Sequence, residues 1–227
     1  MPSCRVISTF KPLLYSDALA RQYELMRLRQ AGEIPDTLLL LEHPPTITLG
    51  RGSVEADLRV SEAELKQRGV AVERVDRGGE ITYHAPGQLV GYPILDLRQH
   101  GQDLHRYLRD LEEVIILTLA HSGLKGERIA GLTGVWVDGR KIAAIGIKVS
   151  RWVTMHGFAL NIDADLTPFR RDFVPCGITD RDVTSQAEQL QEHCPPRAEV
   201  EAALLESFAQ VFGMSLTFAA DLGILSS

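Results

Sequence analysis

The chain contains few cysteines. Its 227 residues include 3 cysteines, which are Cys4, Cys176 and Cys194, and no two of them have CxxC spacing. This small, odd set predicts neither a disulfide framework nor a zinc site. A cysteine that matters to function is therefore expected to act as a free thiol. Cys194 precedes two prolines in a predicted loop, and we expect it to be exposed.

Positive charge and long apolar stretches are also scarce. The formal net charge is −6, whereas nucleic acids and anionic membranes attract clustered positive charge. We therefore expect neither as a partner. Apolar runs such as Leu38 to Leu41 are far shorter than a signal-peptide core or a membrane span. These absences predict a cytoplasmic protein.

Several motifs of phosphate binding, metal binding and nucleophilic catalysis are missing. The glycines after Arg77 do not continue into GxGxxG, and no GKS or GKT sequence follows a glycine-rich turn. No serine lies in GxSxG, and no HExxH or spaced set of carboxylates predicts a metal site. Sulfur is the nucleophile that this sequence favours.

Apolar periodicity predicts one domain of mixed helices and strands. We expect helices that begin at Ser16 or Asp17, at Ser61, at Leu104 and before Val200, and that end at Gly32, Gly69, Gly123 and Gly213. Strands are expected over 37–41, 46–49, 70–75, 135–137, 140–149 and 153–161, with short helical turns at Thr167-Pro168 and after Ser185. Because helices and strands do not alternate regularly, an α+β fold is favoured over a doubly wound one.

The stretch from Arg77 to Pro93, RGGEITYHAPGQLVGYP, has the most unusual composition. It holds 4 of the 19 glycines and 2 of the 11 prolines, among arginine, tyrosine, histidine and glutamine. The Gly78-Gly79 pair predicts a place where a ligand approaches the main chain closely or where φ is positive. We therefore interpret this stretch as a binding loop.

Cys176 and Lys141 are candidates for covalent chemistry. Cys176 lies between Pro175 and Gly177, where a sharp turn would leave its sulfur accessible; a buried, inert cysteine is the alternative. A free thiol is mostly protonated at neutral pH, so catalysis would need a nearby base.

Lys141 follows Asp138-Gly139, which has the composition of a type I′ hairpin turn. Its strand face otherwise carries alanine and isoleucine, and we expect both faces of this strand to be largely buried. An apolar setting disfavours the charged ammonium, so Lys141 could exchange a proton with a thiol or an amine. A lysine that reaches water beside the turn is the alternative.

Two histidines and one arginine are further candidates. His84 and His156 could each act as a general base or be hydrogen-bonded structural residues. Arg77 could belong to a site or be a surface charge beside Asp76.

Four segments occur in the order typical of one known family: RGGEITYHAPGQLVGYP, KIAAIGIKV, HGFALNID and VPCGI. Over about residues 5–217 the chain closely resembles the lipoyl(octanoyl) transferases. The resemblance implies the fold of the biotin/lipoate ligase catalytic domain, a mixed β-sheet flanked by helices. We expect residues 1–227 to form a single catalytic domain with a peripheral tail after residue 218.

The resemblance also implies the site residues. The family's acyl-carrying cysteine falls on Cys176 and its catalytic lysine on Lys141. The substrate-contacting segments fall on Arg77, Gly78, Gly79, Glu80, Ile81, Thr82, Tyr83 and His84, on Ala144, Ile145 and Gly146, and on Gly157, Phe158 and Ala159. Glycines and small side chains suit an apolar slot for an eight-carbon chain, with backbone N–H groups for the thioester carbonyl.

The activity implied is transfer of an octanoyl group from acyl carrier protein to a lysine of lipoyl domains, through a thioester on the cysteine. The acceptors implied are the E2 subunits of 2-oxoacid dehydrogenases and the glycine cleavage H protein. No nucleotide, metal or other cofactor is implied.

Both implied partners are usually acidic, so we expect a local positive rim from Arg51, Arg77, Lys148, Arg151, Arg170 and Arg171.

Other functions fit parts of the pattern. An ATP-dependent lipoate or biotin ligase would share the fold, but only Gly50-Arg51-Gly52 faintly resembles the basic glycine loop of such ligases. A non-catalytic acyl-binding protein would keep the pocket and have a structural Cys176. A cysteine hydrolase would use water in place of the amine.

Overall fold

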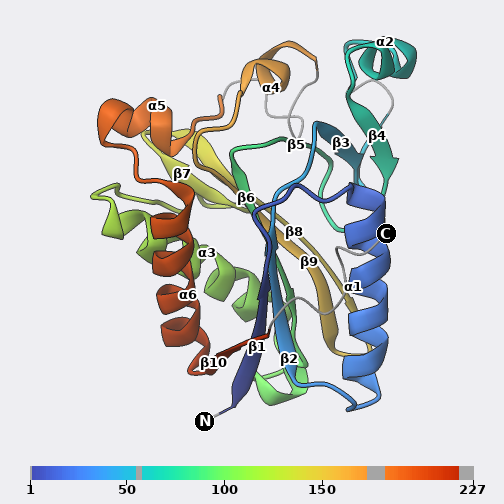
Figure 1. Cartoon of the computed structure of the whole chain (residues 1–227), viewed down its shortest axis with the longest axis vertical. Helices are drawn as coiled ribbons and strands as arrows, with labels where there is room; N and C mark the ends of the chain where they lie inside the picture. Colours follow the sequence, from blue (N-terminus) through green and yellow to red (C-terminus); the bar gives the residue numbers. More distant parts are fainter. Residues whose placement is uncertain (1, 55–57, 173–181, 220–227) are drawn as a thin grey trace.

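The computed structural model of the chain describes residues 2–54, 58–172 and 182–219 (Figure 1). Cys176, the VPCGI segment that contains it, and all but the first residue of the predicted tail lie outside these residues.

The described residues contain a mixed seven-stranded sheet in the order β10-β1-β2-β6-β9-β8-β7. β1 pairs in parallel with β2 and β10, and the other neighbours are antiparallel. The strands are β1 (Ser3–Ser8), β2 (Asp36–Leu41), β6 (Gln88–Ile94), β7 (Val135–Val137), β8 (Arg140–Ser150), β9 (Val153–Asn161) and β10 (Ser215–Phe218). The predicted mixed sheet is confirmed.

Helices cover both faces of this sheet (Figure 1). On one face, α1 (Tyr15–Gln30) packs its buried residues against β2, β6 and β9. On the other, α3 (Leu104–His121) and α6 (Arg197–Phe212) pack together and against the sheet. Two apolar layers therefore hold the sheet between them, and the burial of these layers is the main force that stabilises the fold.

A second, three-stranded sheet lies beyond one end of the large one (Figure 1). Its order is β4-β3-β5, from β3 (Thr46–Leu49), β4 (Ala71–Arg74) and β5 (Ile81–His84). Short helices lie at this end: α2 (Glu62–Gln67), α4 (Thr167–Arg171) and α5 (Gln186–Leu190), which continues into a 3₁₀ turn at Gln191–His193. Another 3₁₀ turn spans Leu97–Gln99. The small sheet has its own apolar cluster.

Local sequence signals predict most of these elements correctly. Ser61 and Ser185 each accept a hydrogen bond from the backbone N–H three residues on, as capping boxes require. Asp138 and Gly139 have φ of 50° and 73°, which confirms the type I′ turn. The start of α1 was predicted wrongly, because the helix begins at Tyr15 after Leu14 and without a side-chain cap.

Two expectations about burial and conformation are also wrong. In β8 only Ile142 and Ala143 are buried and the other residues are half-buried, because a cavity lies along the strand. Most of the stretch from Arg77 to Pro93 is strand and not loop, since β5 and β6 occupy it. Gly91 permits this in β6: a Cβ there would lie 2.2 Å from the ring of Phe158 on β9. Glycine in this strand marks a close approach by a neighbour.

Candidate active site

A cavity of about 230 Å³, the central cavity, opens where the two sheets meet. Its walls include 11 of the 14 predicted substrate-binding residues and Lys141. These are Arg77, Gly79, Glu80, Thr82, His84, Ala144, Ile145, Gly146, Gly157, Phe158 and Ala159, from the loop before β5 and from β5, β8 and β9. Gly78, Ile81 and Tyr83 do not line it. The structure thus brings together segments far apart in the sequence, while their role in binding stays a prediction.

Part of the wall is a strip of small residues on β8 and β9. Ala144 lies opposite Ala159, and Gly146 lies opposite Gly157, in the antiparallel register. Gly157 also allows a close approach to β6, since a Cβ there would lie 2.2 Å from the Gly91 carbonyl oxygen. A strip without large side chains leaves room for an extended apolar group.

The glycine-rich loop is held against both sheets by backbone hydrogen bonds. Gly78 N–H donates to the Ile147 carbonyl at 2.8 Å, and Gly50 and Gly52 donate to Glu80 and Gly79, each at 3.1 Å. Arg77 is buried rather than a surface charge, and its guanidinium bonds the Thr48 hydroxyl at 2.8 Å. Close packing of the loop on β8 explains its glycines.

Lys141 is half-buried at the start of β8. Its Nζ lies 4.9 Å from the centre of the Trp136 ring, and its backbone pairs with the Asp182 carbonyl and the Thr184 N–H, each at 2.9 Å. The pairing fixes the lysine backbone beside the segment where the described chain resumes after Cys176. Nothing in the described residues tests the role of Cys176 itself.

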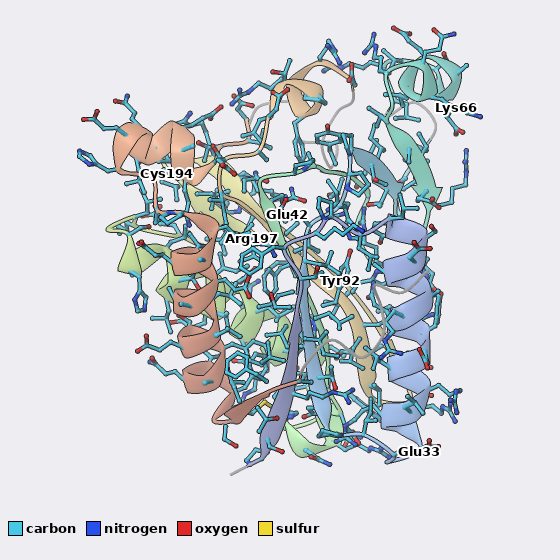
Figure 2. All side chains as sticks on the ribbon, in the orientation of Figure 1. Glu33, Glu42, Lys66, Tyr92, Cys194 and Arg197 are labelled. Atoms are coloured by element: carbon cyan, nitrogen blue, oxygen red, sulfur yellow. The ribbon has the colours of Figure 1, made fainter. Side chains whose placement is uncertain are left out.

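The other two cysteines are poor nucleophiles. Cys4 is fully buried, and burial raises the pKa of its thiol to about 12. Cys194 is half-buried rather than exposed, with Sγ 3.9 Å from the Ile162 carbonyl, and burial raises its pKa too (Figure 2). Both thiols therefore stay protonated at neutral pH.

Tyr15, His84, Tyr92 and His156 line the central cavity, and the buried His43 packs among them. Tyr15 packs against His43 and His84, and Tyr92, in the middle of the molecule in Figure 2, packs against His43 and His156. His43 Nδ1 donates to the Leu13 carbonyl at 2.7 Å, so Nε2 accepts from the Tyr92 hydroxyl at 2.7 Å.

These histidines are held neutral. Burial lowers the pKa of His43 and His156 to about 4 and that of His84 well below its ordinary value. His156 has a φ of 57° within β9, and its ring bonds the Asp76 carboxylate at 3.2 Å. A positive φ is uncommon for a residue with a side chain and marks a strained position, often at a functional site.

Sequence reasoning missed six residues that line the cavity. They are Tyr15, Tyr92, Gly131, Leu132 and Thr133, and also His156, for which we expected either a general base or a hydrogen-bonded structural residue. Tyr92 lies within the quoted first motif, so that motif carried a signal for it. Tyr15 and the 131–133 loop carry no local signal, because only tertiary contacts bring them to the site.

The predicted positive rim is mostly neutralised. Lys148 pairs with Asp76, Arg170 bonds Asp182 and Glu188, and Arg171 bonds Asp172. With the burial of Arg77, this removes four of the six expected cations from a positive rim, whereas Arg51 and Arg151 are exposed.

The described residues contain neither a candidate metal cluster nor a candidate membrane-spanning helix. No cluster of three or more histidine, cysteine or acidic side chains in this part of the chain is placed to hold a metal ion. No helix within residues 2–54, 58–172 and 182–219 is long and apolar enough to span a membrane.

Comparison with known proteins shows two kinds of similarity. Residues 14–209 match the model of the lipoyl protein ligase A/B catalytic domain. An octanoyltransferase of Nostoc sp. is 53% identical over 213 residues, covering 90% of this chain and 93% of that protein. An octanoyltransferase of Chloroflexus aggregans is 55% identical over 203 residues, covering 88% and 91%.

Proteins of much lower sequence identity share the fold. A putative lipoate protein ligase from T. acidophilum, solved with bound lipoic acid, superposes with a TM-score of 0.79 at 17% identity, covering 98% of this chain and 91% of that one. The expected ligase-like fold is confirmed. The chain belongs to the lipoyl protein ligase A/B catalytic domain family and, within it, to the octanoyltransferases.

Proposed function

We propose that this octanoyltransferase takes the octanoyl group from the phosphopantetheine thioester of acyl carrier protein, holds it on Cys176, and passes it to a lysine of a lipoyl domain. The observation that carries the proposal is the central cavity, which joins Lys141 to the strip of small residues on β8 and β9. We place the reaction in the cytoplasm, where both protein partners would be met.

The cavity suits a single acyl chain. A volume of about 230 Å³ lies below the range of about 300–1,000 Å³ typical of drug-sized ligands. Burial of the seven carbons beyond the octanoyl carbonyl contributes on the order of 5 kcal/mol. The acyl group therefore needs no charged partner for binding.

In the first half-reaction, Lys141 as a neutral amine takes the proton of the Cys176 thiol. The thiolate attacks the thioester carbonyl carbon, a new C–S bond forms, and the bond to the phosphopantetheine sulfur breaks. The departing thiolate takes the proton from the Lys141 ammonium. The charge that develops on the carbonyl oxygen requires hydrogen-bond donors, which glycine-rich backbone can present.

In the second half-reaction, the uncharged acceptor lysine attacks the acyl-enzyme. A C–N bond forms, the C–S bond to Cys176 breaks, and Lys141 moves the amine proton to the leaving cysteine thiolate. The energy of the thioester drives amide formation, so the cycle balances without a nucleotide, metal or other cofactor.

Intact-protein mass spectrometry tests the proposal. After the enzyme is mixed with octanoyl-acyl carrier protein and no ATP, we expect a single octanoyl adduct that is absent in Cys176→Ala. Addition of a lipoyl domain should remove the adduct from the enzyme and transfer it to the domain. A missing adduct, an adduct unaffected by Cys176→Ala, or a requirement for ATP would overturn the proposal.

Lys141→Ala gives a second test. We expect the variant to fold, because Lys141 is half-buried and its pairing to 182–184 uses the backbone. Transfer should fall by about 100-fold or more, as for loss of a general base. Turnover close to that of the unmodified enzyme would remove Lys141 from the mechanism.

A further inference from the structure

A continuous chain of hydrogen bonds joins two residues of the central cavity, His84 and Lys141. His84 Nδ1 lies 2.8 Å from Gln88 Oε1, and Gln88 Nε2 lies 2.9 Å from Asn161 Oδ1. Asn161 Nδ2 donates to the Thr184 carbonyl, and the Thr184 N–H donates to the Lys141 carbonyl, each at 2.9 Å. The three side chains in this series of hydrogen bonds, those of His84, Gln88 and Asn161, come from β5, β6 and β9. These three residues and Thr184 are buried.

The donor and the acceptor of each hydrogen bond can be assigned from the backbone carbonyls that take part. The carbonyls of Thr184 and Tyr83 can only accept, and they accept from the amides of Asn161 and Gln88. Each amide nitrogen is thereby identified, and Gln88 Oε1 is left as an acceptor. His84 Nδ1 must then donate to it. A neutral imidazole carries only one N–H, so Nε2 of His84 holds a lone pair.

That lone pair has no hydrogen-bond partner among residues 2–54, 58–172 and 182–219, although His84 lines the central cavity. Nε2 is not sealed away from the cavity, so a group that enters can replace water as its hydrogen-bond donor. The octanoyl chain has no donor, and its carbonyl oxygen only accepts. The attacking amine keeps an N–H after it gives one proton to Lys141.

We propose that Gln88 and Asn161 are positioning residues that hold His84 as the Nδ1–H tautomer, and that His84 Nε2 accepts an N–H of the lysine amine that attacks the octanoyl group. This inference deepens the proposed function and rests on it. Lys141 and His84 then hold two N–H groups of one nitrogen, which directs its lone pair at the acyl carbon.

Nitrogen-15 NMR of the histidine side chains tests the tautomer in the free enzyme, without any substrate. At pH 7 we expect His84 as the Nδ1–H form in the unmodified protein and in Gln88→Glu, which keeps the acceptor. Gln88→Leu, and to a smaller extent Asn161→Leu, should shift His84 toward the Nε2–H form. An Nε2–H form in the unmodified protein, or no shift in Gln88→Leu, would overturn the proposal.

Gln186→Leu is the matched control. Gln186 is as buried as Gln88, but its side-chain amide has no hydrogen-bond partner within the described part of the chain. It lines a different cavity, between α3 and α6. We expect its replacement to leave the His84 tautomer and both half-reactions unchanged, and thermal unfolding of every variant checks that each is folded.

Separate kinetics of the two half-reactions test the role of Nε2. For Gln88→Leu we expect octanoylation of Cys176 at close to the unmodified rate and transfer to the lipoyl domain slowed about tenfold or more, the effect of one hydrogen bond. Gln88→Glu should restore part of the transfer rate. Equal loss in both half-reactions, or no loss in transfer, would overturn the role of His84. If the unmodified enzyme forms no adduct, the proposed function fails while the tautomer result still stands.

Discussion

The carboxylate of Asp76 lies 3.2 Å from Nε2 of His156, and it also bonds the Lys148 ammonium and the Tyr23 hydroxyl. Burial raises the pKa of Asp76, but the hydrogen bonds from Lys148, Tyr23 and His156 outweigh it and hold the pKa well below its ordinary value. The carboxylate therefore orients the imidazole at the strained position on β9, which lies on the wall of the central cavity.

Stability should fall in mild acid because of His43 and His156. Their pKa values are lowered from 6.5 to about 4 by burial. As the pH falls below 6.5, the unfolded chain takes up protons that the folded protein does not, so the free energy of unfolding decreases between pH 6.5 and 4. The loss is up to about 3 kcal/mol for each histidine. Urea unfolding across this range measures it.

Two variants test whether the buried histidines cause this pH dependence of stability. His43→Gln removes one titrating group, so stability should change less steeply with pH. His193→Gln is the control, because His193 is exposed and away from the core. Stability that is constant from pH 7 to 4.5 would contradict the prediction.

Glu112 should stabilise a wall of the central cavity. Its buried carboxylate bonds Arg109 at 2.6 Å, Arg128 at 3.0 Å and the Gly134 N–H at 3.1 Å, next to the 131–133 loop. Glu112→Gln should cost about 2 kcal/mol, less than a fully buried ion pair because both arginines are partly exposed. KM for the acyl donor should rise as well.

Glu113→Gln provides the comparison, since the Glu113 side chain is partly exposed and, within the described part of the chain, forms an ion pair only with Arg128. Its cost should be below about 1 kcal/mol. Equal stability losses in the two variants would argue against a special role for Glu112.

Gly157 should tolerate no side chain. A Cβ there would lie 2.2 Å from the Gly91 carbonyl oxygen and 2.6 Å from Pro93 Cδ, so β6 and β9 would have to separate. We expect Gly157→Ala to lose at least about 2 kcal/mol of stability. In Gly78→Ala the nearest atom would lie at 3.4 Å, and the loss should be small. Thermal unfolding of both variants measures these losses. A Gly157→Ala variant as stable as the unmodified protein would show that β6 and β9 can move apart.

Acyl-chain selection should depend on the small residues of β8 and β9. Ala144 lines the cavity opposite Ala159, so Ala144→Val shortens the space for the chain. The ratio of the octanoyl transfer rate to the hexanoyl transfer rate should fall by roughly tenfold, which is the discrimination that one or two methylenes of pocket length provide. Ala120→Val, on the exposed side of α3, should leave the ratio unchanged. An unchanged ratio in Ala144→Val would place the acyl chain elsewhere.

Sequence patterns predict elements well where the signal is local. The capping boxes at Ser61 and Ser185 and the Asp138-Gly139 turn use atoms within a few residues, so neighbouring letters contain the information. The strand β6 was missed because its glycine and proline are unfavourable locally. Its stability comes from β2 and β9 on either side and from the Phe158 ring that fills the space above Gly91.

The sequence by itself determined the family, the order of most elements and the residue types of the site, because these depend on motifs and short-range periodicity. Only the tertiary structure decided that Arg77 is buried, that Lys148, Arg170 and Arg171 are paired, and that Tyr15 and the 131–133 loop line the same cavity. It also decided the direction of hydrogen bonds between His84 and Thr184. Burial and pairing are set by contacts between residues distant in the chain, and no local pattern encodes them.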